Sequence, residues 1–163
     1  MSIERVAVNA SPLITLYRAN LHPLLPQIFP EILVPEAVWD EVVSCTHDDP
    51  AAQGLPIAVW ARKTTATIRP EVEAWNLGAG ETALLSLAFA DKRTVVIMDD
   101  RAARRCAQVF GIASIGTAGV VVLAKRRGFI PSIEQALRQL QAAGLWMSEA
   151  LISQLAAEDQ PSL

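Results

Sequence analysis

Residues 94–128, TVVIMDDRAARRCAQVFGIASIGTAGVVVLAKRRG, contain the pattern that decides the fold. Two short apolar runs have the length of buried strands, and each is followed by a longer segment of helical periodicity that stops at a glycine. They predict strands at 94–98 and 113–115 and helices at 101–110 and 117–127. Parallel strands need crossover helices and are buried on both faces. The alternation therefore predicts an α/β fold with a mainly parallel sheet between layers of helices.

The same signals extend outward in both directions from this stretch. Ser11 and Pro12 are expected to open the first helix as N-cap and first helical residue, and Ser132 and Gln135 have the spacing of a capping box. The further predicted elements are strands at 6–8 and 32–34, helices at 11–17, 36–44, 55–61, 81–90, 132–143 and 148–157, a polar loop at 45–54 and an edge strand at 64–68.

Composition limits the classes of protein to consider. The chain has 163 residues, 52% of them hydrophobic, so we expect one domain over 1–163, with 131–163 as a C-terminal helical extension. Fourteen Lys and Arg against seventeen Asp and Glu give a net charge of -3, which excludes binding nucleic acid through bulk positive charge. Cys45 and Cys106 lie far apart, and no segment has the character of a signal or membrane helix. A reduced, cytoplasmic protein without a membrane partner is expected.

Polar residues follow three of the predicted strands. In open parallel sheets, ligands bind at the carboxyl ends of the strands, so these residues are candidates for a site. Adjacent acids after a buried strand also repel each other unless a positive group lies between them, although one of them as the N-cap of the next helix is the structural alternative. The candidates are Asn9 and Ser11 after the first strand, Asp99 and Asp100 after the strand at 94–98, and Thr117 after the next.

Two predicted helices add carboxylates. Glu81 shares a helix face with Leu84 and Leu85, which is the face that packs on the sheet. Because a buried unpaired charge is costly, Glu81 is expected to bind a metal or a base, or to cap its own helix after Gly80. Glu41 lies at the margin of its helix's apolar stripe, where a ligand and a solvated acid are equally compatible with the pattern.

Arg101, Arg104 and Arg105 lie off the apolar stripe in the first turns of their helix. Cations are unfavourable at a helix N-terminus unless anions neutralise them, so these arginines indicate an anionic polymer or an acidic partner. The basic residues at 125–127 occupy a last helical turn, where the dipole favours cations, and are assigned to structure.

Other site classes are excluded by their context. The letters GAGETA at 78–83 match a dinucleotide fingerprint, but no strand is predicted before them. His22 precedes a proline and His47 lies in the polar loop, so neither suits the base of a Ser-His-Asp or Cys-His site.

Five segments together resemble the PIN domain, and more closely a bacterial and archaeal branch of predicted nucleic-acid-binding proteins. They are VNASPLITL at 8–16, LVPEAVWDEV at 33–42, GAGETALLSLA at 78–88, VIMDDRAARRCAQVFG at 96–111 and IGTAGVVVLAKRRG at 115–128. The resemblance implies a PIN-like three-layer fold with a sheet of four to five strands, and an acidic pocket that binds Mg²⁺ or Mn²⁺ to cleave single-stranded RNA. Many relatives are VapC-like toxins held inactive by a small antitoxin, so an antitoxin partner and a homodimer are expected.

Carried onto this sequence, the resemblance assigns Glu41, Glu81 and Asp100 to the pocket, with Asp99 beside them and Ser11 and Thr117 as hydroxyl neighbours. Most PIN nucleases end the first strand in an aspartate, whereas this chain has Asn9. The amide oxygen of Asn9 remains a ligand for a hard cation, but one negative charge is removed.

Two hypotheses follow. The first is a metal-dependent endoribonuclease in which the catalytic acids Glu81, Asp100, Glu41 and Asp99 hold the metal, with Asn9 as an auxiliary ligand. One or more of the arginines at 101, 104 and 105 contact phosphates. The alternative is a catalytically weakened PIN-like module that binds nucleic acid or a protein without cutting.

Overall fold

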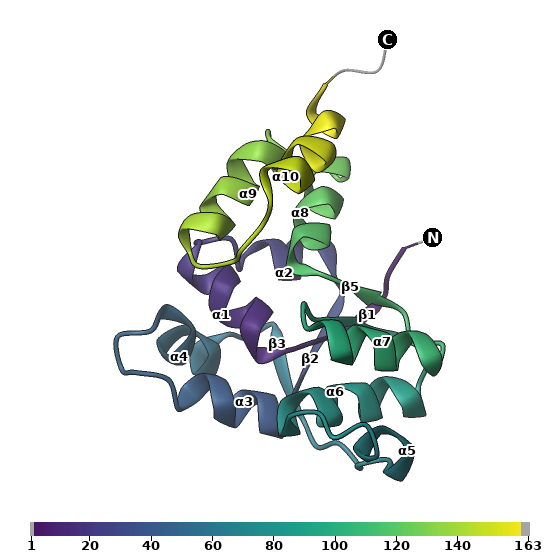
Figure 1. The fold of residues 1–163 in the computed structure, drawn as a ribbon. Coiled ribbons are helices and arrows are strands. Elements are labelled where there is room, and N and C mark those ends of the chain that lie inside the picture. Colours follow the sequence, from purple (N-terminus) through teal and green to yellow (C-terminus); the bar gives the residue numbers. More distant parts are fainter. Residues whose placement is uncertain (1, 161–163) are drawn as a thin grey trace.

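A five-stranded sheet forms the centre of the computed structural model, which describes residues 2–160 (Figure 1). The strands are β1 (Arg5–Val8), β2 (Glu31–Pro35), β3 (Ala61–Thr64), β4 (Thr94–Ile97) and β5 (Ser114–Ile115). Their order is β3-β2-β1-β4-β5, and every neighbouring pair is parallel. The predicted α/β fold with a parallel sheet flanked by helices is confirmed.

Helices connect the strands and continue beyond the last of them. They are α1 (Ala10–Arg18), α2 (Leu24–Ile28), α3 (Glu36–Val43), α4 (Pro50–Gly54), α5 (Pro70–Glu73), α6 (Ala79–Ala90), α7 (Arg101–Val109), α8 (Thr117–Arg126), α9 (Ile133–Ala142) and α10 (Glu149–Ala156), with short 3-10 turns η1 (Leu55–Ile57) and η2 (Ala157–Asp159). Within residues 2–160, none of these helices combines the length and the apolar character needed to cross a membrane.

Successive residues of β1 face opposite sides of the sheet, and each side has its own core. Val6 and Val8 pack with apolar residues of α1, α2, α8 and α9. Ala7 packs with those of α6 and α7, including Leu84 and Cys106. This alternation is the expected consequence of strand geometry in a sheet buried on both faces. The two cores hold the helical layers in place and so fix where each strand and helix begins and ends.

The first helix begins earlier than its expected cap. Asn9, with extended backbone, is the N-cap of α1, and its carbonyl accepts a hydrogen bond from Leu13 N–H at 3.3 Å. Ser11 is therefore not the N-cap and lies exposed in the first turn. Pro12 is still tolerated there because the first N–H groups of a helix have no intrahelical partner.

The segment between α3 and β3 also differs from expectation. Residues 45–54 are not loop throughout, because α4 forms at Pro50 and the carboxylate of Asp49 caps it through Ala51 N–H at 2.9 Å. The expected helix at 55–61 is reduced to the single turn η1. The edge strand lies at Ala61–Thr64 and not at 64–68. Its position is determined by pairing with β2, and the alternation of its own side chains does not determine it.

α9 packs against α8 and α10 packs against α9, and side chains cap the start of both helices. Ser132 Oγ accepts a hydrogen bond from Gln135 N–H at 3.1 Å, which confirms the predicted cap of α9. Asp159 accepts hydrogen bonds from two further N–H groups at the same helix start, those of Ile133 at 2.7 Å and Glu134 at 3.0 Å. Arg126 pairs with Glu158 at 2.6 Å, as expected for a structural basic residue in the last turn of α8. Residues 158 and 159 thus close the chain back onto α8 and α9.

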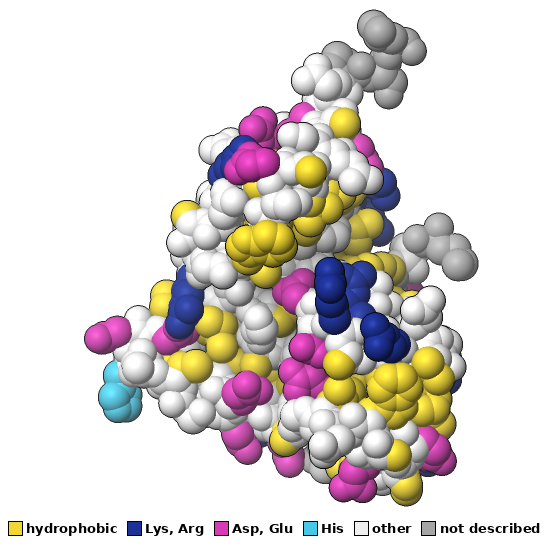
Figure 2. Space-filling view, viewed as in Figure 1, with side chains coloured by type: hydrophobic (Ala, Val, Ile, Leu, Met, Phe, Trp, Pro, Cys, Tyr) yellow, Lys and Arg dark blue, Asp and Glu magenta, His cyan; other side chains and the backbone are white. Residues whose placement is uncertain are grey.

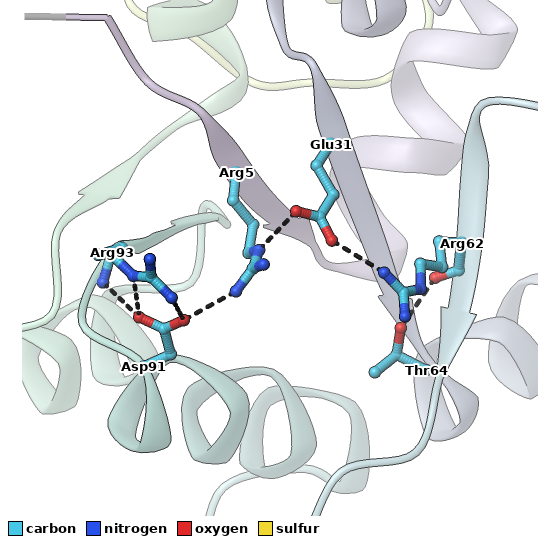
Figure 3. A network of polar contacts seen from close by, with 6 residues as sticks. All are labelled: Arg5, Glu31, Arg62, Thr64, Asp91 and Arg93. Carbon is cyan, nitrogen blue, oxygen red and sulfur yellow. Dashed lines mark hydrogen bonds and ion pairs between the residues drawn. The ribbon is translucent and has the colours of Figure 1, made fainter.

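A network of ion pairs covers the amino edge of the sheet (Figure 3). Arg5 on β1 pairs with Glu31 and with Asp91, both at 2.8 Å. Arg62 on β3 completes the pairing of Glu31 at 3.1 Å, and Arg93 completes that of Asp91 at 2.8 Å. The hydrogen bonds and charge of Arg93, together with the charge of Arg5, hold the pKa of Asp91 well below its usual range. Every carboxylate of this network has a basic partner.

Candidate active site

The carboxyl ends of β1, β4 and β5 lie side by side. Val8 pairs with Ile97, which in turn pairs with Ile115. The N–H of Asn9 donates a hydrogen bond to the carbonyl oxygen of Ile97 at 3.0 Å. Ile97 is the last residue of β4, and Met98 and Asp99 follow it. The residues that follow these strands therefore share one edge of the sheet, the position where ligands bind in open parallel folds.

Asn9 is a buried polar side chain of this edge that contacts an acid. It is 3% exposed, and its amide Nδ2 donates a hydrogen bond to Glu81 Oε1 at 3.1 Å. Its amide oxygen Oδ1 is buried and has no hydrogen-bond partner among the described residues. An orphaned buried oxygen is costly, because the free energy of its lost hydration is not recovered. The atom is therefore free to bind a ligand.

Glu81 stands in the first turn of α6, and two glycines make room for the acids around it. A methyl group at Gly80 would lie 3.1 Å from Glu41 Oε2 and 3.3 Å from Asn9 Oδ1, so both oxygens border this backbone. A methyl group at Gly78 would lie 2.5 Å from Glu81 Oε2. Gly78 is the N-cap of α6 and provides no side-chain cap, and Glu81 accepts a hydrogen bond from Asn9, the residue after β1.

Glu41 on α3 faces the same glycine. Partial burial raises the pKa of Glu41, and the negative charge of Glu81 raises it further. Burial disfavours the charged form of a carboxyl group, and a nearby like charge does the same. The two carboxylates therefore share a region of negative potential from opposite helices, which a cation would relieve.

Asp99 and Thr117 form the adjoining part of the edge. Asp99 Oδ1 accepts a hydrogen bond from Thr117 N–H at 2.8 Å, and Oδ2 accepts one from Thr117 Oγ at 2.6 Å. Thr117 is fully buried at the start of α8, so these bonds hold the Asp99 carboxylate in one orientation. A methyl group at Gly116 would lie 3.0 Å from Asp99 Oδ1 and 3.4 Å from an Arg104 guanidinium nitrogen.

The structure separates the two adjacent aspartates. Asp100 is exposed and is the N-cap of α7, where its Oδ2 accepts a hydrogen bond from Ala103 N–H at 2.9 Å. This is the structural role that the sequence left open for one of the pair. Asp99 is half-buried and is bonded to Thr117 on the next strand-end. The carboxylate of Asp99 thus stays at the edge of the sheet, whereas that of Asp100 is used to cap α7.

The donor set suits one divalent cation. Within residues 2–160, no three Asp, Glu, His or Cys side chains gather closely enough to form a metal site by themselves. Asn9 supplies the missing donor, because its orphaned Oδ1 and Glu41 Oε2 border the same glycine and Glu81 is bonded to its amide. An amide oxygen and carboxylates are the ligands that hard cations such as Mg²⁺ and Mn²⁺ prefer. The residues therefore fit such an ion.

A groove of about 1060 Å³ is lined by Asp99, by residues of α7, by β5 and the start of α8, and by the connection from α9 to α10 with α10 itself. Arg101, Arg104 and Arg105 line one side of it, and Trp146 lies on the other. Figure 2 shows dark blue side chains over α7 beside magenta ones, with a yellow patch over the α9–α10 connection across from them. We name this feature the α7–α10 groove.

Sequence reasoning missed two contributors to this region. Gly144, two residues before Trp146, has a positive φ of 110°. This glycine was the sequence signal for a turn at this position, next to which the tryptophan is exposed. Gly80 stands directly before Glu81, and its lack of a side chain leaves room for Glu41 and Asn9 to approach. A glycine directly before a predicted helix indicates close packing. The periodicity of the sequence does not show which element packs against it.

Comparisons with known proteins agree with this geometry. A family model described as a PIN domain matches residues 5–160, which is nearly the whole chain. No curated protein matches the chain. PIN domains are generally nucleases that bind nucleic acid and typically use divalent metal ions. The fold, the acidic edge and this match together show that the chain belongs to the PIN-domain family.

Proposed function

We propose that this protein is a metal-dependent endoribonuclease that acts on single-stranded RNA, with Mg²⁺ or Mn²⁺ as its cofactor. The observation that carries the proposal is the buried Oδ1 of Asn9, which has no hydrogen-bond partner among residues 2–160 and borders Gly80 together with Glu41 Oε2. The Nδ2 atom of the same side chain donates to Glu81. A buried oxygen without a partner, next to two carboxylates, indicates a cation site more strongly than the acids alone.

Asn9, Glu41 and Glu81 are the residues that would hold the cation, with Asp99 from the next strand-end completing the pocket. When bound, a divalent cation lowers the pKa of water and offsets negative charge on a phosphodiester. The side chains prepare this site in advance. The amide of Asn9 orients Glu81, and Thr117 orients Asp99 through two hydrogen bonds. Arg104 beside Gly116 is placed to neutralise a phosphate next to the acids.

One observation favours the alternative, a PIN-like module that binds without cutting. The Nδ2 of Asn9 donates to Glu81, so the position contributes a neutral amide where most PIN nucleases have a carboxylate. The pocket therefore carries one negative charge fewer, and two metal ions about 4 Å apart are harder to hold with a reduced charge. In this alternative, the protein still binds a nucleic acid or a protein partner but does not cleave RNA.

The resemblance to VapC-like toxins extends the proposal to partners and setting. We propose a toxin role in the cytoplasm, inhibition by a small antitoxin protein and assembly as a homodimer. These points rest on the family resemblance and not on the geometry of the site. A neighbouring reading frame that encodes a small antitoxin-like protein is the observation that would support them, and its absence would count against the toxin role.

The test combines metal binding with cleavage. Calorimetric titration with Mn²⁺ is expected to show one saturable site in the wild type, and cleavage of a labelled single-stranded RNA is expected to require Mn²⁺ or Mg²⁺. Glu81→Gln removes a ligand charge, so it should weaken metal binding and cleavage about 10- to 100-fold. Glu73→Gln, an exposed acid on α5, is the matched control and should change neither.

Asn9→Asp separates the two candidate functions. If the wild type cuts RNA, the endoribonuclease proposal stands. If only Asn9→Asp cuts, the module without cutting is the native function and Asn9 is the cause. Mn²⁺ binding that is unchanged in Glu81→Gln, with no cleavage by either protein, would contradict the pocket assignment itself.

A further inference from the structure

The three arginines of α7 differ from most other arginines of this protein. Within residues 2–160, no carboxylate lies within ion-pair distance of Arg101, Arg104 or Arg105. The paired arginines, by contrast, are Arg5, Arg18, Arg62, Arg69, Arg93, Arg126 and Arg138. All three α7 side chains are exposed and line the α7–α10 groove. They stand at the helix N-terminus, where the dipole opposes positive charge, so an external anion is the partner that would balance them.

Trp146 lies across the groove from these arginines and is 84% exposed. Its neighbour Met147 is buried in the core, and Ser148 caps α10 through a hydrogen bond from Leu151 N–H at 3.1 Å. The backbone on both sides of the indole is therefore anchored, between the turn at Gly144 and the start of α10. An exposed aromatic ring on a fixed backbone provides a stacking surface at low cost in conformational entropy.

The two walls match the two parts of a nucleotide. Guanidinium groups bind phosphates, and an exposed indole face stacks on a base. A base in a duplex has both faces covered by its neighbours, so an aromatic side chain stacks on it only where the strand is unpaired. Asp99 also lines the groove, so a strand lying in it would reach this acid of the candidate active site.

We propose that the α7–α10 groove binds one strand of RNA beside the bond to be cut, with the α7 arginines on its phosphates and Trp146 stacked on an unpaired base. The proposal rests on the proposed function for the identity of the nucleic acid. Trp146 is a positioning residue in this arrangement, because it contacts the strand away from the reacting phosphate. The stacking contact of Trp146 with an unpaired base would also account for a preference for single strands, because a base in a duplex cannot make this contact.

Binding without cleavage tests the groove independently of the chemistry. The probe is a fluorescein-labelled single-stranded RNA of ten nucleotides, measured by anisotropy in EDTA so that no metal-dependent cutting occurs. Trp146→Ala should weaken binding about tenfold, the effect expected for losing one base-stacking contact. Trp146→Phe should recover most of the affinity, because a smaller ring still stacks. Val109→Ala, another exposed apolar side chain, is the matched control.

Two altered probes identify what Trp146 contacts. An RNA of the same length in which every base is replaced by an abasic site should bind wild type and Trp146→Ala equally. A duplex of the same sequence should also bind both proteins equally. If Trp146→Ala binds the single-stranded RNA as tightly as the wild type does, the proposal is overturned. An equal loss on all three probes would also overturn it, since that outcome indicates a general structural effect.

Salt dependence tests the arginine wall. Arg104→Gln and Arg105→Gln should each lower the slope of log affinity against log salt by about one unit, whereas Arg127→Gln, an exposed arginine outside the groove, should leave it unchanged. Equal slopes for all variants would refute the phosphate contacts. Groove-dependent binding in a protein that never cleaves RNA would instead contradict the nuclease proposal alone, so the two failures are distinguishable.

Discussion

The two ends of β1 meet charged residues in opposite ways. At its amino end, Arg5 belongs to a network in which every carboxylate has a basic partner. At its carboxyl end, one oxygen of Asn9 has no hydrogen-bond partner among residues 2–160, and Glu41 lies near another acid, Glu81. The α7 arginines form no ion pair within the described structure, although Arg104 and Asp99 border the same glycine, Gly116. The charged groups at the amino edge of the sheet are thus paired with opposite charges, whereas, among the described residues, those at the carboxyl edge are not.

The difference teaches where to look for function in such a sheet. Ion pairs that satisfy one another inside the protein contribute modestly to stability and leave nothing for a ligand. Polar atoms that stay unsatisfied reduce stability unless a ligand completes them. Perturbations of the carboxyl edge should therefore alter binding and chemistry, and perturbations of the amino edge should alter stability alone.

The sharpest test within the carboxyl edge compares its two adjacent aspartates. Asp99→Asn should lower RNA cleavage in Mn²⁺ about 10- to 100-fold, because it removes a charge from the pocket. Asp100→Asn should keep both cleavage and melting temperature near wild type, since asparagine caps a helix as well as aspartate does. Cleavage assays with melting curves on both variants decide the matter. Loss of activity in Asp100→Asn but not in Asp99→Asn would reverse the assignment.

The amino edge is broken by Arg5→Met, which removes the shared partner of Glu31 and Asp91. We expect a loss of about 1 kcal/mol in the free energy of unfolding, with RNA cleavage unchanged at a temperature where the protein is folded. Denaturant unfolding provides the measurement. A variant with full stability but impaired cleavage would show that the two edges are not independent.

Acid should weaken the same network. The pKa of Asp91 is lowered by folding, so its contribution is present above its unfolded pKa and is lost as the pH falls below about 4. Arg93 is the main cause of the lowered pKa, so the stability difference between wild type and Arg93→Met should shrink over this acidic range. A difference that is constant from neutral pH into strong acid would contradict the role of the network.

The smallest effect is expected at Glu41. Folding raises its pKa, so its carboxyl group favours the folded state below the unfolded value of about 4.5 and loses that advantage as the pH rises. In EDTA at neutral pH, Glu41→Gln should therefore stabilise the protein, by less than about 1 kcal/mol because the side chain is exposed. The gain should vanish below pH 4. Glu36→Gln, on the same helix, is the control, and an equal gain there would remove the site-specific explanation.

The order of strands and helices could be predicted because burial on both faces leaves a local trace. The apolar run of β4 and the glycine stops after α7 and α8 are visible in the sequence alone. The edge strand β3 reads Ala-Arg-Lys-Thr and carries no such trace, since its place depends on pairing with β2. The short helices α2 and α4 are each little more than one turn, too short for a period to show.

The candidate site was predictable to the level of which residues share an edge. Asn9, Asp99 and Thr117 follow neighbouring strands, and parallel topology brings such residues together. The direction of each side chain was not predictable. Asp99 turns to Thr117 while Asp100 caps α7, and this division depends on backbone geometry at the end of β4. The exposure of Trp146 depends on how α10 packs, which spacing does not reveal.

The two outer strands of the sheet bear on how copies of this protein can meet. β3 has four residues and presents the exposed side chains of Arg62 and Lys63, and β5 has two residues. Short edges with charged side chains offer a poor template for another chain's backbone. A continuous sheet running through two molecules is therefore disfavoured at both sides. The expected homodimer should assemble through helices, and its interface should be sensitive to side-chain shape more than to backbone pairing.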